Sequence, residues 1–333
     1  MKSTPLFLLF VALLIGGFVF LNKSQDSVQK SVTNYSEERS MFVEHINMVG
    51  PEEALLMFKR SYENEHFATQ HNMAHIFGEA LHEVFGTDGV VHCDGSFQFG
   101  CFHGFFGVSI ALNGLTILEM LDAACLSAGA QEPSACQHGI GHGILEYIGY
   151  DHLVDALELC ERTNQPNPVA GCTSGVFMEY NVPLSENEYG EFVVTPRPLD
   201  ETNPLTPCSD VPERFRESCY HELPQWWNQV YDQDYKRIAG FCSSLTVLAE
   251  RRACILGVGN IIAPTSDYTV EQSVSWCNEM HRADDVHLCI ASASWSFAAD
   301  EYGRKNAHKL CKHIPNDWDI YSCATEVEQA KKL

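Results

Sequence analysis

Apolar residues recur every three to four positions along most of the chain, in segments separated by short polar connections. One segment, PEEALLMFKRSYE at residues 51–63, opens with proline and two acidic residues, which favour the first turn of a helix. Another, HNMAHIFGEALH at residues 71–82, continues the same spacing. This periodicity is typical of amphipathic helices, so the pattern predicts a mainly α-helical protein.

The helical segments form an internal repeat of about 35 residues. Each unit begins with a helix that opens near a cysteine, as in CFHGFFGVSIALNG, and ends with a second helix that stops at a cysteine, as in HLVDALELC. A two-helix unit of this length is found in TPR-like solenoids, whose units stack on their neighbours. The tetratricopeptide consensus and the close cysteine spacing of Sel1-like repeats are both absent. The predicted fold class is therefore all-α, a disulfide-laddered array of two-helix repeats with no family assigned.

The fourteen cysteines fall in a regular ladder. From Cys101 onward the gaps alternate between a longer step of variable length and a short step of 11 or 12 residues. A nearly constant step indicates a geometric constraint, so we expect the cysteines to pair across the short steps. The predicted disulfides are Cys93–Cys101, Cys125–Cys136, Cys160–Cys172, Cys208–Cys219, Cys242–Cys254, Cys277–Cys289 and Cys311–Cys323.

The pattern divides the chain into three parts. Residues 1–22 contain a nearly unbroken apolar run without a small-residue cleavage site, which favours an uncleaved transmembrane signal anchor over a cleaved signal peptide. Residues 23–45 are polar and predict a flexible stalk. Residues 46–333 form the cysteine-rich repeat domain, and a proline-rich insertion at about residues 182–207 interrupts one of its units.

Charge and cysteine content restrict location and partners. Acidic residues outnumber basic residues 44 to 21, for a formal charge of -23. Such a surface repels nucleic acid and attracts cations, and it also keeps an exported protein soluble. An even number of cysteines in an exported chain indicates an oxidising compartment. We therefore expect a single-pass protein of the cell membrane whose bulk is periplasmic or extracellular, or a secreted protein if the N-terminal segment is cleaved.

Histidines supply the candidate chemistry, and nine of the fifteen lie between residues 66 and 152. Two HxxxH pairs, His71/His75 and His138/His142, each present two imidazoles on one helix face. His103 and His138 both stand two residues after a unit cysteine, and His75 occupies the same place when Gly78 is aligned with Gly141. Equivalent positions of a solenoid form a row, so we expect His71, His75, His103, His138 and His142 to make one metal site.

Several interpretations of this site remain open. Histidine and carboxylate ligands suit Zn, Fe, Cu or Mn, with Glu146 as a candidate general base, and Glu79 and Glu179 as further carboxylates. A bis-histidine haem beside CFHGFFG is a second option, and a structural polar ladder is a third. The glycines beside the histidines, such as Gly104 and Gly141, indicate close approach either of a bound group or of a neighbouring helix.

Two functions fit these features. The first is a metalloprotein, redox or hydrolytic, with its site in the N-terminal repeats; the second is a non-enzymatic scaffold that binds a protein or peptide on the solenoid surface. Motifs for serine hydrolases, P-loop nucleotide binding and dinucleotide binding are absent, so no motif decides whether the protein is an enzyme. The concentration of histidine in the first units favours the metal site. For a metal site, His75, His103, His138 and His142 must converge within a few ångströms.

Overall fold

The structure is a computed structural model that describes residues 35–65, 67–127, 133–164, 169–186, 192–300, 302–315, 323–325 and 327–328. The predicted anchor at residues 1–22 lies outside these ranges. Within them, no single helix is long and apolar enough to cross a membrane, and the one combination that qualifies by length and composition, Gly100–Asn113 with Leu115–Leu126, is bent by 116°.

Most of the described chain is helical, and its units consist of a first helix and a second helix. The first helices are α5 Gly100–Asn113, α7 Pro133–Ile148, α9 Cys172–Asn181, α10 Arg216–Val230, α12 Leu248–Thr265 and α14 Ala283–Ala299. The second helices are α6 Leu118–Ser127, α8 Leu153–Leu159, α11 Tyr235–Ser244, α13 Val270–Cys277 and α15 Ala307–Cys311. Three helices, α2 Tyr35–Val49, α3 Pro51–Tyr62 and α4 Phe67–Phe85, precede these units. Short 3-10 turns at η1 Gly86–His92, η2 Leu115–Ile117, η3 Tyr150–His152, η4 Cys160–Arg162, η5 Glu213–Phe215 and η6 Arg304–Asn306 join them.

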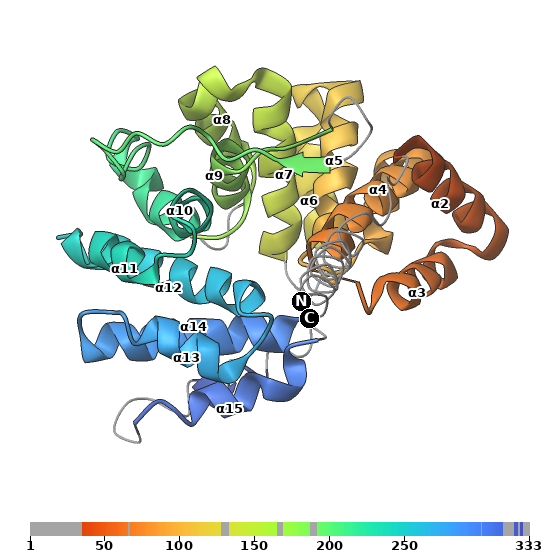
Figure 1. The fold of residues 1–333 in the computed structure, drawn as a ribbon. Coiled ribbons are helices and arrows are strands. Elements are labelled where there is room, and N and C mark those ends of the chain that lie inside the picture. The colour runs from red at the N-terminus through yellow and green to blue at the C-terminus, as the bar shows by residue number, and fades with distance from the viewer. Residues whose placement is uncertain are drawn as a thin grey trace, which may run out of the picture.

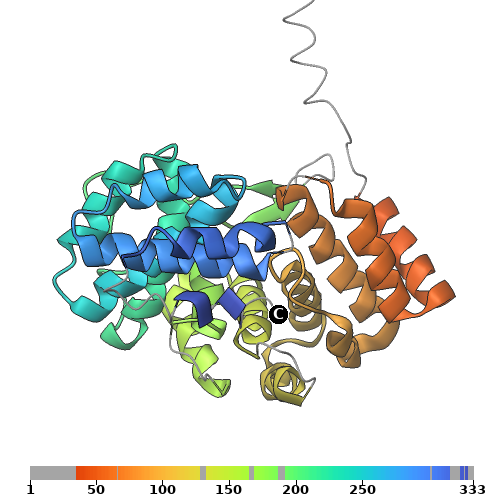
Figure 2. The same cartoon turned by 90° about the horizontal axis from the view of Figure 1, so that it is seen from below.

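The first helices stack in chain order and build a curved array (Figure 1). Each packs against the next in the series α4, α5, α7, α9, α10, α12 and α14. The array bends so far that its C-terminal helices approach the N-terminal ones (Figure 2), and the side chain of Gln98 is hydrogen-bonded to Tyr268 at the end of α12. The first helices line a common cleft, and the predicted helical repeat is confirmed.

Seven disulfides link the units. Five of them join the end of one unit to the first helix of the next, Cys93–Cys101 closes the loop before α5, and Cys311–Cys323 joins α15 to the C-terminal segment. The Cα–Cα distances lie between 5.4 and 5.9 Å, all fourteen cysteines are paired, and the pairs are those that the spacing predicts. Seven intramolecular disulfides are typical of an oxidising, extracytoplasmic environment.

Removing one of these bridges is expected to destabilise the fold without touching the histidines. Cys242–Cys254 joins α11 to α12 and closes a loop of 12 residues. The double substitution Cys242→Ser/Cys254→Ser should lower the free energy of unfolding by about 2–4 kcal/mol, because the unfolded chain regains loop entropy. Urea unfolding followed by circular dichroism measures the change. A loss below about 0.5 kcal/mol would contradict a stabilising role for the ladder.

One predicted segment needs correction. The predicted flexible stalk at residues 23–45 is wrong for residues 35–45, because α2 begins at Tyr35 and buries Phe42 and Ile46, each 2% exposed. These residues lie four apart on one helix face, and the Phe42 ring contacts the rings of Phe58 and Phe77 at 5.4 and 5.5 Å between centroids. Packing of Phe42 in this aromatic cluster therefore makes residues 35–45 part of the folded domain.

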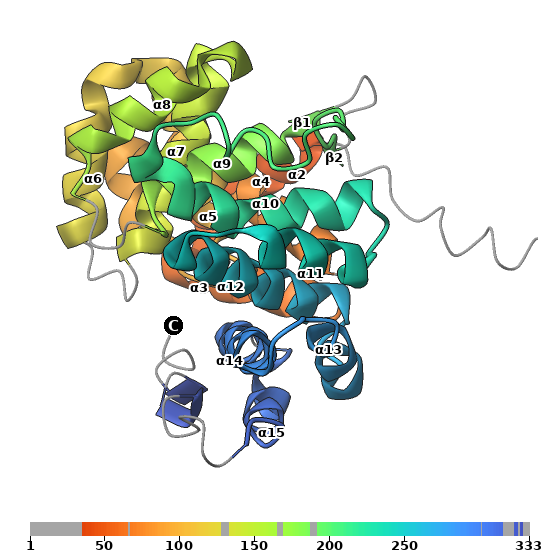
Figure 3. The same cartoon turned by 90° about the vertical axis from the view of Figure 1, so that its left-hand side faces the viewer.

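The predicted insertion at residues 182–207 contains a small antiparallel hairpin, in which β1 Leu184–Glu186 pairs with β2 Phe192–Val194 (Figure 3). Arg197 anchors the following segment, because its guanidinium lies 3.4 Å from the centroid of the Trp226 ring and its Nε donates to Asn181 Oδ1 at 2.7 Å. The insertion is thus packed against α9 and α10.

Candidate metal centre

Glycines let the first helices touch backbone to backbone. A Cβ on Gly104 would lie 2.0 Å from the carbonyl oxygen of His75, and one on Gly175 would lie 1.9 Å from that of His138. Gly78 and Gly141 are equivalent in the repeat, since a Cβ on either would lie 2.0 Å from a cysteine carbonyl of the next helix. Only glycine allows this approach. Close helix packing therefore accounts for the glycines beside the histidines.

The short interhelical distance brings all five predicted histidines together, and we call them the five-histidine cluster. His71 and His75 come from α4, His103 from α5, and His138 and His142 from α7. The rings of His71, His75 and His103 form a triangle with centroid separations of 4.8, 5.1 and 5.1 Å. His75 Nε2 lies 3.1 Å from His71 Nε2 and 3.3 Å from His103 Nδ1.

A second triangle shares His103 with the first. The Nε2 atoms of His138 and His142 lie 3.0 Å apart, and the His103 ring stacks on His142 with centroids 4.4 Å apart. In each triangle, one nitrogen from every ring lies within 4.8 Å of the other two. Three histidines at such distances can bind a metal ion together.

In three of the rings, the nitrogen that faces away from the cluster makes a hydrogen bond that shows which nitrogen carries the proton. His71 Nδ1 donates to the carbonyl oxygen of Phe97 at 2.9 Å, and His142 Nδ1 donates to Glu179 Oε2 at 2.9 Å. Both partners accept only, so Nδ1 carries the proton and Nε2 carries a lone pair that faces the cluster. This is the usual arrangement behind metal-binding histidines, whose outward N–H is held by a carbonyl or a carboxylate.

His138 is held in the same way through a serine. Its Nδ1 donates to Ser174 Oγ at 3.0 Å, and the Ser174 hydroxyl in turn donates to Glu222 Oε1 at 2.5 Å. His221 Nδ1 also lies 2.7 Å from Glu222 Oε1. Burial by itself would raise the pKa of Glu222, but His221, His138 and Ser174 together hold it below its ordinary value. Glu222 is therefore a buried anion behind His138.

Burial keeps four of the five rings neutral. Desolvation is the main cause that lowers the pKa of His71 to about 4 and that of His138 to about 3. Desolvation also lowers the pKa of His75 and His103 well below the ordinary value. Neutral imidazole is the form that binds metal ions, so at neutral pH these four rings are ready to act as ligands.

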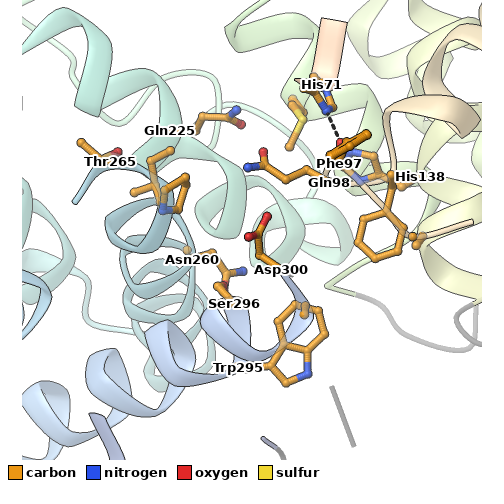
Figure 4. A pocket seen from close by; sticks show the side chains of 18 of the residues that line it. His71, Phe97, Gln98, His138, Gln225, Asn260, Thr265, Trp295, Ser296 and Asp300 are labelled. Atoms are coloured by element: carbon orange, nitrogen blue, oxygen red, sulfur yellow. Dashed lines mark hydrogen bonds between the residues drawn. The ribbon is translucent and has the colours of Figure 1, made fainter. Parts of the chain in front are cut away.

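The cluster faces a cleft of about 2090 Å³ that the first helices and their loops line. His71 and His138 lie on one wall, and Asn260, Ser296 and Trp295 lie across from them (Figure 4). The side chain of Gln98 points from the loop before α5 toward the opposite wall (Figure 4). The candidate ligands are thus accessible from a space large enough for a substrate or a peptide.

Glu146, the predicted general base, stands apart from this wall. It follows His142 by one helical turn, but its residue is exposed and its carboxylate lies beside Gly107. Desolvation and Glu179 raise its pKa, and His142 opposes them. The described residues that line the cleft include Glu179 and Glu222 and do not include Glu146. A catalytic role for Glu146 stays a prediction.

The other predicted carboxylate, Glu79, lies outside the cluster and pairs with Arg39 at 3.8 Å. Sequence reasoning named Glu179, which holds His142, but missed the other side chains behind the rings, Ser174 and Glu222. Ser174 occupies the place two residues after a cysteine that His103 and His138 fill in other units. Three residues after the unit cysteine, four other units have glycine, whereas the unit of α10 has Glu222. This departure from the repeat could have identified Glu222 from the sequence.

Strained backbone accompanies the cluster. Phe97, Gln98 and Phe99 have φ of 53°, 57° and 62°, in the left-handed region that non-glycine residues seldom adopt. This conformation aims the Phe97 carbonyl at His71. Such strain is concentrated at functional sites. No family model, curated protein or solved structure matches the chain, so the candidate function rests on its own geometry.

Proposed function

We propose that the protein is a membrane-anchored, extracytoplasmic metalloprotein whose five-histidine cluster binds transition-metal ions and serves redox or hydrolytic chemistry in the cleft. The observation that carries the proposal is the pair of Nε2 atoms of His138 and His142, 3.0 Å apart. Both rings hold their proton on Nδ1, so the two lone pairs face each other. A cation between them removes this repulsion.

The ligand set narrows the choice of metal. All fourteen cysteines are bridged, so thiolates are not available, and the nearest carboxylates stand behind the rings. Imidazole ligands alone suit Cu²⁺ and Zn²⁺ better than Mn²⁺, which prefers oxygen, and Fe²⁺ is intermediate. Haem fits poorly, because neighbouring ring nitrogens only 3.0–3.3 Å apart leave no gap for a flat macrocycle.

Chemistry at the site follows from the small number of protein ligands. Each triangle offers three histidines, and three ligands leave a position open in a tetrahedral site. An ion with an open position can activate water or accept a substrate atom. Glu179 and Glu222 would orient the imidazoles and partly balance the positive charge. The acidic surface, with a formal charge of -23, would attract cations to the protein.

The alternative function, a scaffold for a protein or peptide, is favoured by the size of the cleft. Its volume of about 2090 Å³ exceeds the roughly 300–1,000 Å³ of common small-ligand pockets. The lining extends beyond the histidines to α12 and α14, where Leu256, Ile261 and Trp295 add apolar surface. A peptide segment would fill this space better than a small metabolite.

Metal analysis separates the two functions. We expect the full-length chain, exported into an oxidising compartment and purified in detergent, to contain near-stoichiometric metal by inductively coupled plasma mass spectrometry. His138→Gln/His142→Gln should lose metal, because it removes two facing ligands. The matched control is His152→Gln, which changes a 58%-exposed side chain outside the cluster. A folded chain that contains no metal and takes up neither Zn²⁺ nor Cu²⁺ would refute the metalloprotein and leave the scaffold.

A further inference from the structure

The geometry points to a centre for two metal ions in which His103 is shared as a bridging ligand. This inference rests on the proposed function and deepens it. We call the triangle of His71, His75 and His103 the α4 site, and the triangle of His103, His138 and His142 the α7 site. We further infer that the two sites differ in affinity and that the α7 site is the stronger.

We assign one nitrogen of His103 to each site. Its Nδ1 lies 3.3 Å from His75 Nε2, in the α4 site. Its Nε2 is buried and has no hydrogen-bond partner among the residues that the structure describes. The whole residue is only 5% exposed, so this nitrogen is withdrawn from bulk water. An unsatisfied buried nitrogen costs about 1–3 kcal/mol, and such a group needs an explanation. A metal ion in the α7 site supplies one.

A single ion cannot use all five rings. The two nitrogens of an imidazole carry lone pairs that diverge in the ring plane, so Nδ1 and Nε2 of His103 cannot bind the same ion. The other four rings form two pairs, one in each triangle. For His103 to bind through both nitrogens, its ring N–H proton passes to solvent, and the two cations compensate the negative charge of the imidazolate.

The groups behind the rings make the two sites unequal. In the α4 site, His71 is held by a neutral backbone carbonyl. In the α7 site, His142 is held by Glu179, and His138 is connected through Ser174 to Glu222. Both carboxylates are nearly buried, with 6% and 5% exposure. Buried anions strengthen the basicity of the imidazoles and attract a cation in a medium that screens weakly.

A titration of the metal-free, full-length chain with Zn²⁺ tests the number of ions. We expect two ions per chain, bound with different affinities. His75→Gln should abolish the weaker event, and Glu179→Gln should weaken the stronger event about 10–100-fold while leaving the weaker one unchanged. Glu158→Gln, at a 55%-exposed side chain, is the matched control. Saturation at one ion would overturn the two-ion centre but keep the proposed function. Uptake of no ion would refute both.

Copper tests the bridge itself. Two Cu²⁺ ions joined by one imidazolate are magnetically coupled, so the electron paramagnetic resonance signal per copper should be well below that of isolated Cu²⁺. In His103→Gln the coupling should vanish and both affinities should fall, because each site loses one of its three ligands. Two ions with full, uncoupled signals in the wild-type protein would overturn the bridging role. If His103→Gln does not fold, the wild-type spectrum decides the question alone.

Discussion

Replacing Gly175 by alanine is expected to destabilise the protein by about 3 kcal/mol. The new methyl group would lie 1.9 Å from the carbonyl oxygen of His138, a backbone atom that cannot rotate away. Helix α9 would have to move away from α7. This movement would break the hydrogen bond between His138 Nδ1 and Ser174 Oγ, which are 3.0 Å apart in the wild-type structure. The substitution should therefore also weaken metal binding, although the histidines themselves are unchanged.

The matched control is Gly240→Ala in α11. A Cβ at Gly240 would meet nothing within 4 Å, so alanine should stabilise this helix by about 1 kcal/mol through its better helix propensity. Urea unfolding of the wild type and both variants, followed by circular dichroism, measures the two changes. Effects of the same sign, or a Gly175→Ala variant as stable as the wild type, would show that backbone contact between α7 and α9 is not required.

The second large effect concerns pH. Without metal, we expect the stability of the protein to fall as the pH decreases from about 6.5 to about 4. An unfolded histidine has a pKa of about 6.5, whereas His71 titrates at about 4 and His138 at about 3 in the folded state. Between these values the unfolded chain binds more protons, so acid favours unfolding. The contribution of His71 alone is about 3 kcal/mol.

Denaturation curves at pH 7, 6, 5 and 4.5 measure this dependence above the range in which most carboxylates protonate. Glu146 acts in the opposite direction, because its raised pKa makes protonation stabilise the folded state. The variant His71→Gln/His138→Gln removes two of the four cluster histidines whose pKa is lowered, so the slope of its curve should be smaller. His152→Gln, outside the cluster, should keep the wild-type slope. A wild-type curve that is flat over this range would contradict a neutral, buried cluster.

The disulfide pairs could be predicted from the local spacing of the cysteines. A spacing of 11 or 12 residues spans one helix–helix connection, and only partners across that connection can meet at the same distance in every unit. Sequence reasoning failed at residues 35–45, because α2 is held by tertiary contacts. Its Phe42 packs against the rings of Phe58 in α3 and Phe77 in α4, and local sequence does not reveal these contacts. Sequence reasoning also missed the short hairpin within the insertion.

By itself, the sequence determined the repeat, the disulfide pairs and the row of histidines, because all three follow from positions that recur at a constant interval. Only the tertiary structure decided how the row divides into two triangles around His103. It also decided which acceptors hold the rings, since Ser174 and Glu179 lie 36 and 37 residues from the histidines they contact. Such contacts depend on side-chain rotamers and on the close approach of helices at glycine, and both are set when the helices pack together.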